Sequence, residues 1–127
     1  MADGSKHEEA VIHAFVRREK RDRFLGFLAT AKNRRKFTTS LAHFRWFDPR
    51  FASPAQGTEN VEGLLRSKGA GRTCWVISED STIDGKELEL GAALEYVDGR
   101  QMGTILSCIP GRLAYFEGED EALILAR

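Results

Sequence analysis

The densest concentration of groups that could bind a ligand is a basic segment in the N-terminal half of the chain. Residues 17–50 contain eleven Lys and Arg residues but only three Asp and Glu residues. Lysine and arginine side chains contact phosphate groups, and single-stranded bases stack on aromatic rings, so this composition suits a polyanion such as RNA or DNA. The candidate contact residues are the least charge-balanced cations of the segment and a neighbouring tryptophan: Arg34, Arg35, Lys36, Arg45, Trp46 and Arg50.

The same segment also has simpler interpretations. If a helix runs through it, Arg18 and Asp22 are four residues apart and can form an ion pair. Glu19 and Arg23 have the same spacing, as on an ordinary solvated or protein-facing surface. The aromatic residues of the loop RWFDPRF, residues 45–51, could form a recognition surface or could fold back to close the core. The sequence favours the solvated or protein-facing surface and the closing of the core.

A second hypothesis is a small enzyme or ligand-binding protein with a pocket between helices and sheet. Its polar groups would be one histidine, one thiol and two carboxylates: His43, Cys108, Glu79 and Asp84. A cysteine and a histidine can form a nucleophilic pair when the fold brings them together. Cys108, however, lies in the apolar run TILSCIPG, where burial raises the pKa of a thiol and makes it inert. Ser107 beside it lacks the G-x-S-x-G context of a nucleophile elbow.

The acidic segment SEDSTIDG, residues 78–85, has the composition of a cation-binding loop but not its spacing. Counted as an EF-hand loop from Asp80, it has Thr82 at the third position and Gly91 at the twelfth, where a bidentate Glu is required. The three histidines of the chain do not form a ligand set, and no glycine-rich phosphate-binding motif is present. We therefore expect no metal site and no cofactor.

The elements that must position these groups begin with a helix near the N-terminus. Ser5 and Glu8 have the S-x-x-E spacing of a capping box and predict its start. At about 100° per residue, the apolar side chains of residues 11–16 and those of residues 24–28 centre about 170° apart. A straight helix would present opposed apolar faces, so either it breaks within residues 17–23 or its first turns pack against another chain. The second alternative predicts a homodimer.

Three more elements complete the N-terminal half. Apolar residues recur at helical spacing over residues 37–44 and predict a further helix. Two prolines predict a loop over residues 45–54. Thr58 is placed to cap a short helix that ends at Gly69.

From residue 72 onward the pattern changes to short strands separated by turns. The predicted strands are residues 73–78, 86–90, 103–109, 113–117 and 121–126, with a short helix over residues 90–97. These elements predict an α+β fold in which N-terminal helices, residues 5–68, pack on one face of a C-terminal antiparallel sheet of four to five strands. The predicted core consists of Phe24, Leu28, Phe37, Leu41, Leu64, Trp75, Ile77, Leu94, Ile105, Leu113, Tyr115, Leu123 and Leu125.

Length and charge limit the class of protein. The chain has 127 residues, 42% hydrophobic and 30% charged, which predicts one globular domain over residues 1–127. Its formal net charge of zero divides into +5 for residues 1–60, with 12 basic and 7 acidic residues, and −5 for residues 61–127, with 7 and 12. No apolar run is long enough to span a membrane and the N-terminus lacks an export signal, so we expect a cytoplasmic protein.

Two functions stay open at this point. Because no paired acid–base motif is present, the sequence favours a non-catalytic interaction or regulatory module. Such a module would engage a protein or a polyanion through its basic helical half, residues 1–68, and the opposed apolar faces would make it a homodimer. The alternative is the small enzyme or ligand-binding protein that uses His43 and Cys108.

Overall fold

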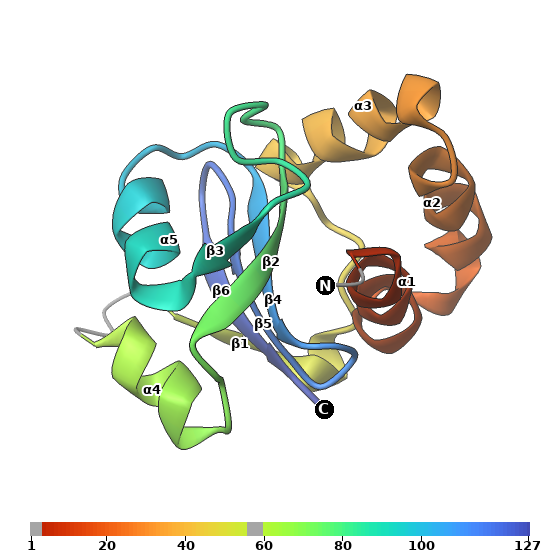
Figure 1. The fold of residues 1–127 in the computed structure, drawn as a ribbon. Helices are drawn as coiled ribbons and strands as arrows, with labels where there is room; N and C mark the ends of the chain where they lie inside the picture. Colours follow the sequence, from red (N-terminus) through yellow and green to blue (C-terminus); the bar gives the residue numbers. More distant parts are fainter. Residues whose placement is uncertain (1–3, 56–59) are drawn as a thin grey trace.

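The structure of this protein is a computed structural model that describes residues 4–55 and 60–127 (Figure 1). Its α-helices are α1 (Gly4–Phe15), α2 (Arg21–Leu28), α3 (Ala31–Ser40), α4 (Val61–Ser67) and α5 (Leu90–Val97). Single 3-10 turns are η1 (Arg18–Lys20), η2 (Leu41–His43) and η3 (Pro49–Phe51). None of the helices in this described part of the chain has the length and apolar character needed to cross a bilayer.

The strands form one antiparallel sheet, which confirms the α+β class. They are β1 (Ala52–Pro54), β2 (Thr73–Ser78), β3 (Glu87–Glu89), β4 (Thr104–Ile109), β5 (Leu113–Glu117) and β6 (Ala122–Ala126). Their order across the sheet is β1-β6-β5-β4-β2-β3, so there are six strands instead of the four to five predicted. The additional strand is β1, which lies within the segment predicted as a loop. A proline is compatible with it because β1 is an edge strand, where a missing backbone N–H breaks no ladder.

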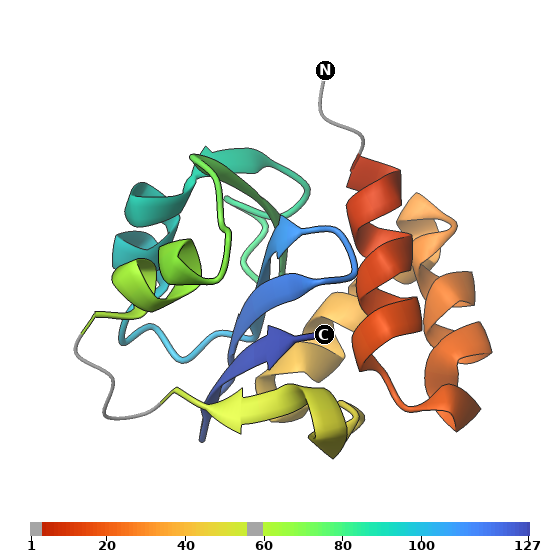
Figure 2. The ribbon, with the colours of Figure 1, turned by 90° about the horizontal axis from the view of Figure 1, so that it is seen from below.

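Helices cover both faces of the sheet, with α1, α2 and α3 on one side and α4 and α5 on the other (Figures 1 and 2). The prediction that all helices of residues 5–68 share one face is therefore wrong for α4. The physical reason lies in the central strands, whose alternate side chains are buried on both sides. In β4, Ile105 belongs to the core cluster under α1 and α3, whereas Leu106 belongs to the cluster under α4 and α5.

The first helix breaks where its two apolar faces conflict. α1 ends at Phe15, and the chain turns through η1 before α2 begins. The turn is held by a β-bridge between Val16 and Phe47 and by a hydrogen bond of 2.7 Å from the Arg17 amide to the Trp46 carbonyl. Because of the break, the apolar residues of α1 and α2 enter the same core cluster. The geometric reason for expecting a homodimer is thereby removed.

The predicted helix caps differ from those in the structure. Ser5 lies inside α1, and the buried Glu8 carboxylate accepts hydrogen bonds from other elements, so the predicted capping box is wrong. Thr58 lies outside the described residues. At the start of α4 the Asn60 side chain accepts a hydrogen bond of 2.8 Å from the Gly63 amide.

Most of the predicted core is buried. The buried members are Phe24, Phe37, Leu41, Ile77, Ile105, Leu113, Tyr115 and Leu125. The other five are partly buried and pack against the same two clusters: Leu28, Leu64, Trp75, Leu94 and Leu123. The short helix α5 and the strands after it also lie where the sequence predicted them.

Candidate functional site

Arg34, a predicted ligand contact, is instead part of a buried ion cluster. Its Nε and Nη2 donate to the Asp84 carboxylate at 2.8 and 2.9 Å, and its Nη1 donates to Glu8 Oε1 at 2.7 Å. The second Glu8 oxygen accepts a hydrogen bond of 2.8 Å from the indole Nε1 of Trp75. Hydrogen bonds to Asp84 and Glu8 raise the pKa of Arg34 above its usual value, against the effect of burial. Arg34 therefore joins α1, α3 and the β2–β3 loop and is not available to a ligand.

Arg50, another predicted contact, is also engaged within the fold. Its guanidinium donates to both oxygens of Asp48, with a shortest distance of 2.7 Å, and lies over the Phe51 ring. Asp48 in turn caps η3 by accepting from the Arg50 amide at 3.0 Å. These hydrogen bonds from Arg50 lower the pKa of Asp48 to about 2. The pair stabilises the turn before β1.

The other basic residues of residues 17–36 lie at the surface of η1, α2 and α3, and we call this surface the basic face. Among all the Lys and Arg residues of residues 17–36, Arg34 is the only one that forms an ion pair with a carboxylate within the described chain. The predicted pair of Arg18 and Asp22 is absent, because Arg18 lies in η1 and Asp22 in the following helix. The members of the basic face are Arg17, Arg18, Lys20, Arg21, Arg23, Lys32, Arg35 and Lys36.

Two aromatic rings lie among these cations. The Arg23 guanidinium and the Lys36 ammonium lie 5.5 and 5.7 Å from the ring centre of Phe27, which is partly buried. The Lys20 ammonium lies 4.3 Å from the ring centre of Trp46. Aromatic rings attract cations through their negative faces, so each ring holds positive charge next to apolar surface.

The loop of residues 45–51 divides between the two interpretations. Phe47 is buried and closes the core, as favoured from the sequence, and Phe51 is partly buried. Trp46 is 38% exposed, the most exposed large apolar side chain of the described residues. The backbone bridge to Val16 sets this alternation, because successive side chains of an extended segment point in opposite directions.

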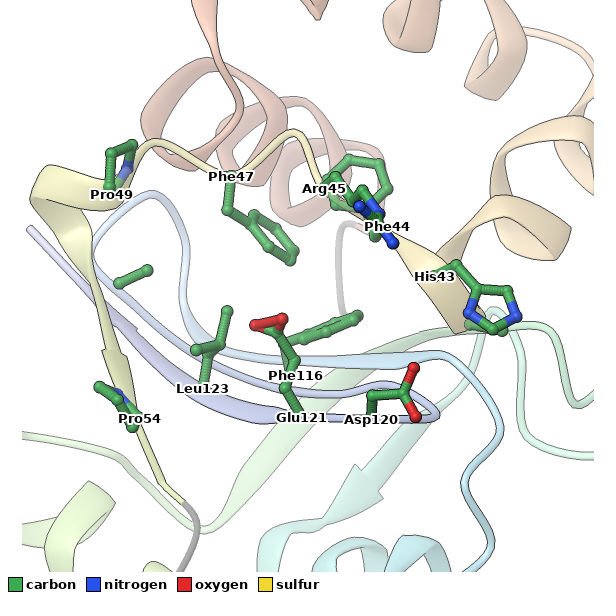
Figure 3. Close-up of a pocket in the computed structure, with 12 residues that line it drawn as sticks. His43, Phe44, Arg45, Phe47, Pro49, Pro54, Phe116, Asp120, Glu121 and Leu123 are labelled. Carbon is green, nitrogen blue, oxygen red and sulfur yellow. The ribbon is translucent and has the colours of Figure 1, made fainter.

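A cleft of about 490 Å³ opens on the inner side of this loop (Figure 3). Its floor is a row of paired residues from three strands, with Phe116 opposite Leu123 and Leu123 opposite Pro54. Phe44 and Phe47 form the wall above them. The main contacts of α1 with the sheet are with β2 and β4 and those of α3 are with β2, whereas the cleft lies between the loop and residues of β5, β6 and β1.

Charged groups of both signs surround this apolar floor. The His43 ring lies 2.9 Å from a Glu119 carboxylate oxygen, and the Glu119 amide donates to the Ala42 carbonyl at 2.8 Å. Arg45 and Glu121 also line the cleft, and the Glu121 carboxylate points into it beneath Phe47 (Figure 3). Among the described residues, neither Arg45 nor Glu121 forms an ion pair.

The structure does not bring His43 and Cys108 together. Cys108 packs in the cluster under α4 and α5, whereas His43 follows α3 on the other side of the sheet. Burial raises the pKa of Cys108 to about 12, and that of Cys74 to about 12 as well. The chemistry of a reactive thiolate at neutral pH is therefore not supported at either residue.

A serine–histidine contact occurs elsewhere, between Ser107 and His7. The Ser107 hydroxyl lies 2.7 Å from His7 Nδ1, and the His7 ring stacks on Trp75. Ser107 is fully buried, so a substrate carbonyl has no access to its oxygen. This contact joins α1 to β4 and serves packing.

The two carboxylates of the predicted enzyme site are also occupied by structural hydrogen bonds. Glu79 accepts from the Gly103 amide at 3.0 Å, and its carbonyl accepts from Arg35 at 3.2 Å. Asp84 accepts from the Ser78 amide at 2.9 Å in addition to Arg34. In the described ranges, no group of three or more His, Cys, Asp and Glu side chains could hold a metal ion.

The cleft includes residues that were not predicted to be functional, above all Glu121, Leu123 and Phe116. Of its lining, His43 and Arg45 were named as candidates, and Phe47 lies in the loop that was considered as a recognition surface. Glu121, in the turn before β6, and Leu123, in β6, are two residues apart and both line the cleft, and this spacing is the signal that the sequence offers. A comparison of the chain with protein-family models, curated proteins and solved structures finds no match.

Proposed function

We propose that this protein is a non-catalytic binding module that engages a polyanion, a single-stranded nucleic acid, through its basic face. The observation that carries the proposal is the uncompensated charge of that surface. Residues 17–36 contain nine Lys and Arg against two Asp and Glu, and Arg34 alone among those cations is neutralised by ion pairs within the described chain. A surface of this kind attracts a phosphate backbone and releases its counterions.

The position of the cations supports this function. α2 packs on α1 and α3 and lies away from the sheet, so its outer side and that of α3 are presented to solvent (Figure 2). Arg23, Arg35 and Lys36 are exposed there. Ordinary solvated helices carry alternating charges that pair four residues apart, and the break at η1 removes that pairing.

The aromatic rings favour single strands over a duplex. Trp46 is exposed next to Lys20, and Phe27 lies between Arg23 and Lys36. Unpaired bases stack on such rings with little sequence preference, and each stack contributes roughly 1–3 kcal/mol. The competing ligand is a protein with an acidic surface. Such a partner would bind through the cations of the basic face and would not need the rings of Trp46 and Phe27.

The burial of both thiols and of the Ser107 hydroxyl supports a binding role. The thiols of Cys74 and Cys108 are held protonated by burial, and the Ser107 hydroxyl is buried beneath His7. The His43 ring pairs with Glu119 at the surface, away from the two thiols and the Ser107 hydroxyl. The surfaces of this protein are thus better suited to recognition than to bond making.

The test is binding of a fluorescent poly(U) RNA of about 20 nucleotides by anisotropy, together with the same length of oligo(dT) and a duplex. With three phosphate contacts, the affinity should fall roughly 20-fold when salt rises from about 50 to about 200 mM. The triple variant Arg23→Gln, Arg35→Gln and Lys36→Gln should bind about 10-fold more weakly at low salt. Trp46→Ala should weaken single-strand binding and leave any duplex binding unchanged.

A matched control variant loses the same number of positive charges, but from residues outside the basic face. Lys68→Gln, Arg72→Gln and Arg112→Gln remove three exposed cations from other elements and should change the affinity less than about twofold. Equal weakening in both triple variants would mean that net charge alone drives binding. The proposal fails if no polynucleotide binds at low salt, or if the affinity does not depend on salt.

A further inference from the structure

The cleft beneath Phe47 is separate from the basic face and has its own chemistry. Trp46 and Phe47 are adjacent in an extended segment, so Trp46 points to the basic face while Phe47 points into the cleft. The volume of about 490 Å³ lies within the roughly 300–1,000 Å³ of small-molecule sites. Its floor is apolar, which favours a ligand with an apolar body.

The charges at the cleft restrict the ligand further. Arg45 carries a positive charge, and Asp120 and Glu121 carry negative ones; all three side chains line the same cavity, and Arg45 and Glu121 do not pair with each other. A purely anionic ligand would be repelled by Glu121, and a purely cationic ligand by Arg45. A ligand that carries both charges can pair with both groups.

We propose that the cleft binds a small zwitterion with an apolar body, of the class of free apolar α-amino acids and apolar dipeptides. The ligand carboxylate pairs with Arg45, whose guanidinium can hold both of its oxygens. The ligand ammonium pairs with the Glu121 carboxylate, and the apolar side chain lies on Phe116 and Leu123 beneath Phe47. No covalent step is involved.

The experiment is an NMR titration of the ¹⁵N-labelled chain with L-phenylalanine and with L-leucyl-L-phenylalanine. Binding should shift the amide signals of Phe47, Phe116 and Leu123 with a Kd of about 1 mM or below for one of the two probes. The stronger probe reports the spacing of the two charges. Two analogues then remove one charge each: N-acetyl-L-phenylalanine has no ammonium, and phenethylamine has no carboxylate.

Single variants assign each charge of the ligand to its partner. In the unmodified protein both analogues should bind at least about fivefold more weakly than L-phenylalanine. Glu121→Gln should remove the preference for L-phenylalanine over the N-acetyl compound and keep the preference over phenethylamine. Arg45→Gln should do the reverse. Both residues are exposed, so the variants should fold, which the spectrum itself verifies.

Glu95→Gln on α5 and Arg72→Gln before β2 remove exposed charges elsewhere and should leave all affinities unchanged. The proposal is overturned if neither zwitterion shifts the cleft signals up to about 20 mM. It is equally overturned if the two charge-deficient analogues bind as tightly as L-phenylalanine, since the cleft would then select only for apolar bodies.

Discussion

Arg34 of α3 and Asp84 of the β2–β3 loop are joined by two parallel hydrogen bonds of 2.8 and 2.9 Å, although fifty residues separate them in the chain. This geometry holds the outer helical layer against the sheet, because Arg34 also donates to Glu8 of α1. The side chains of Arg34, Glu8 and Asp84 keep 20%, 10% and 15% of their surface exposed, so the cluster is largely shielded from solvent.

Arg34→Met should lower the free energy of unfolding by about 2–3 kcal/mol, because Glu8 and Asp84 would be left as unpaired, mostly buried charges. Urea unfolding followed by circular dichroism measures the change. Adding Glu8→Gln and Asp84→Asn to Arg34→Met should recover part of the loss, since the stranded charges are then gone. Arg35→Met, one residue away and exposed, should change stability by less than about 0.5 kcal/mol. A loss of equal size in both single variants would contradict the role of the cluster.

Glu117→Gln should stabilise the protein at neutral pH. Burial, with the nearby charge of Asp98, raises the pKa of Glu117 despite a hydrogen bond of 2.9 Å from the Tyr115 hydroxyl. Its Oε2 is buried without a hydrogen-bond partner among the described residues. Because the folded state binds this proton more tightly than the unfolded state, stability falls as pH rises from about 4.3 through the raised pKa. Thermal unfolding between pH 4 and 8 should show a gain of less than about 1 kcal/mol at pH 7, with no gain at pH 4.

Asp48 should give the stability of the folded state the opposite pH dependence to that of Glu117. Hydrogen bonds from Arg50 lower its pKa to about 2, so the folded state binds this proton less tightly than the unfolded state. The contribution of Asp48 to stability is fully present above the ordinary aspartate pKa of about 3.9 and is lost as the pH falls through about 2. A carbon-detected NMR titration of the Asp48 carboxyl group should therefore give a midpoint near pH 2. With Arg50→Gln the midpoint should return toward the ordinary value, and an unchanged midpoint would rule out Arg50 as the cause.

The two thiols should react slowly in the folded protein. With a pKa of about 12 each, roughly one ten-thousandth of either thiol is ionised at pH 8. Alkylation by iodoacetamide should therefore be at least about 100-fold slower than for free cysteine, and addition of urea should restore the ordinary rate. Mass spectrometry after partial alkylation assigns the rate to Cys74 or Cys108. A fast reaction at Cys108 in the absence of urea would revive the enzyme hypothesis.

The elements of the C-terminal half could be predicted because their signals are local. The helical spacing from Leu90 to Val97 and the aromatic pair Tyr115 and Phe116 in β5 lie within single elements. β1 could not be predicted in this way. It has three residues including Pro54, and what makes it a strand is pairing with β6, some seventy residues further along the chain.

The candidate sites were predictable only in part. The charged residues of a segment can be counted in the sequence, but the groups with which each one forms ion pairs cannot be read from it. The excess of cations in residues 17–36 is visible in the sequence, and the basic face follows from it. That Arg34 is engaged and Arg35 is exposed depends on where Glu8 and Asp84 fall in space. The cleft depends on three separate segments, the loop with Phe47, the strand with Phe116 and the turn with Glu121. No single stretch of sequence contains its signature.

The two edges of the sheet have a consequence for how copies of this protein behave at high concentration. β1 and β3 each have three residues, far fewer than the strands between them. Pro54 withholds an amide hydrogen from one edge, and Glu87 and Glu89 place negative charges along the other. A second chain that approached either edge would find a short, interrupted or repulsive template. The sheet is thus protected against growing from one molecule into the next, which favours solutions that stay clear when concentrated.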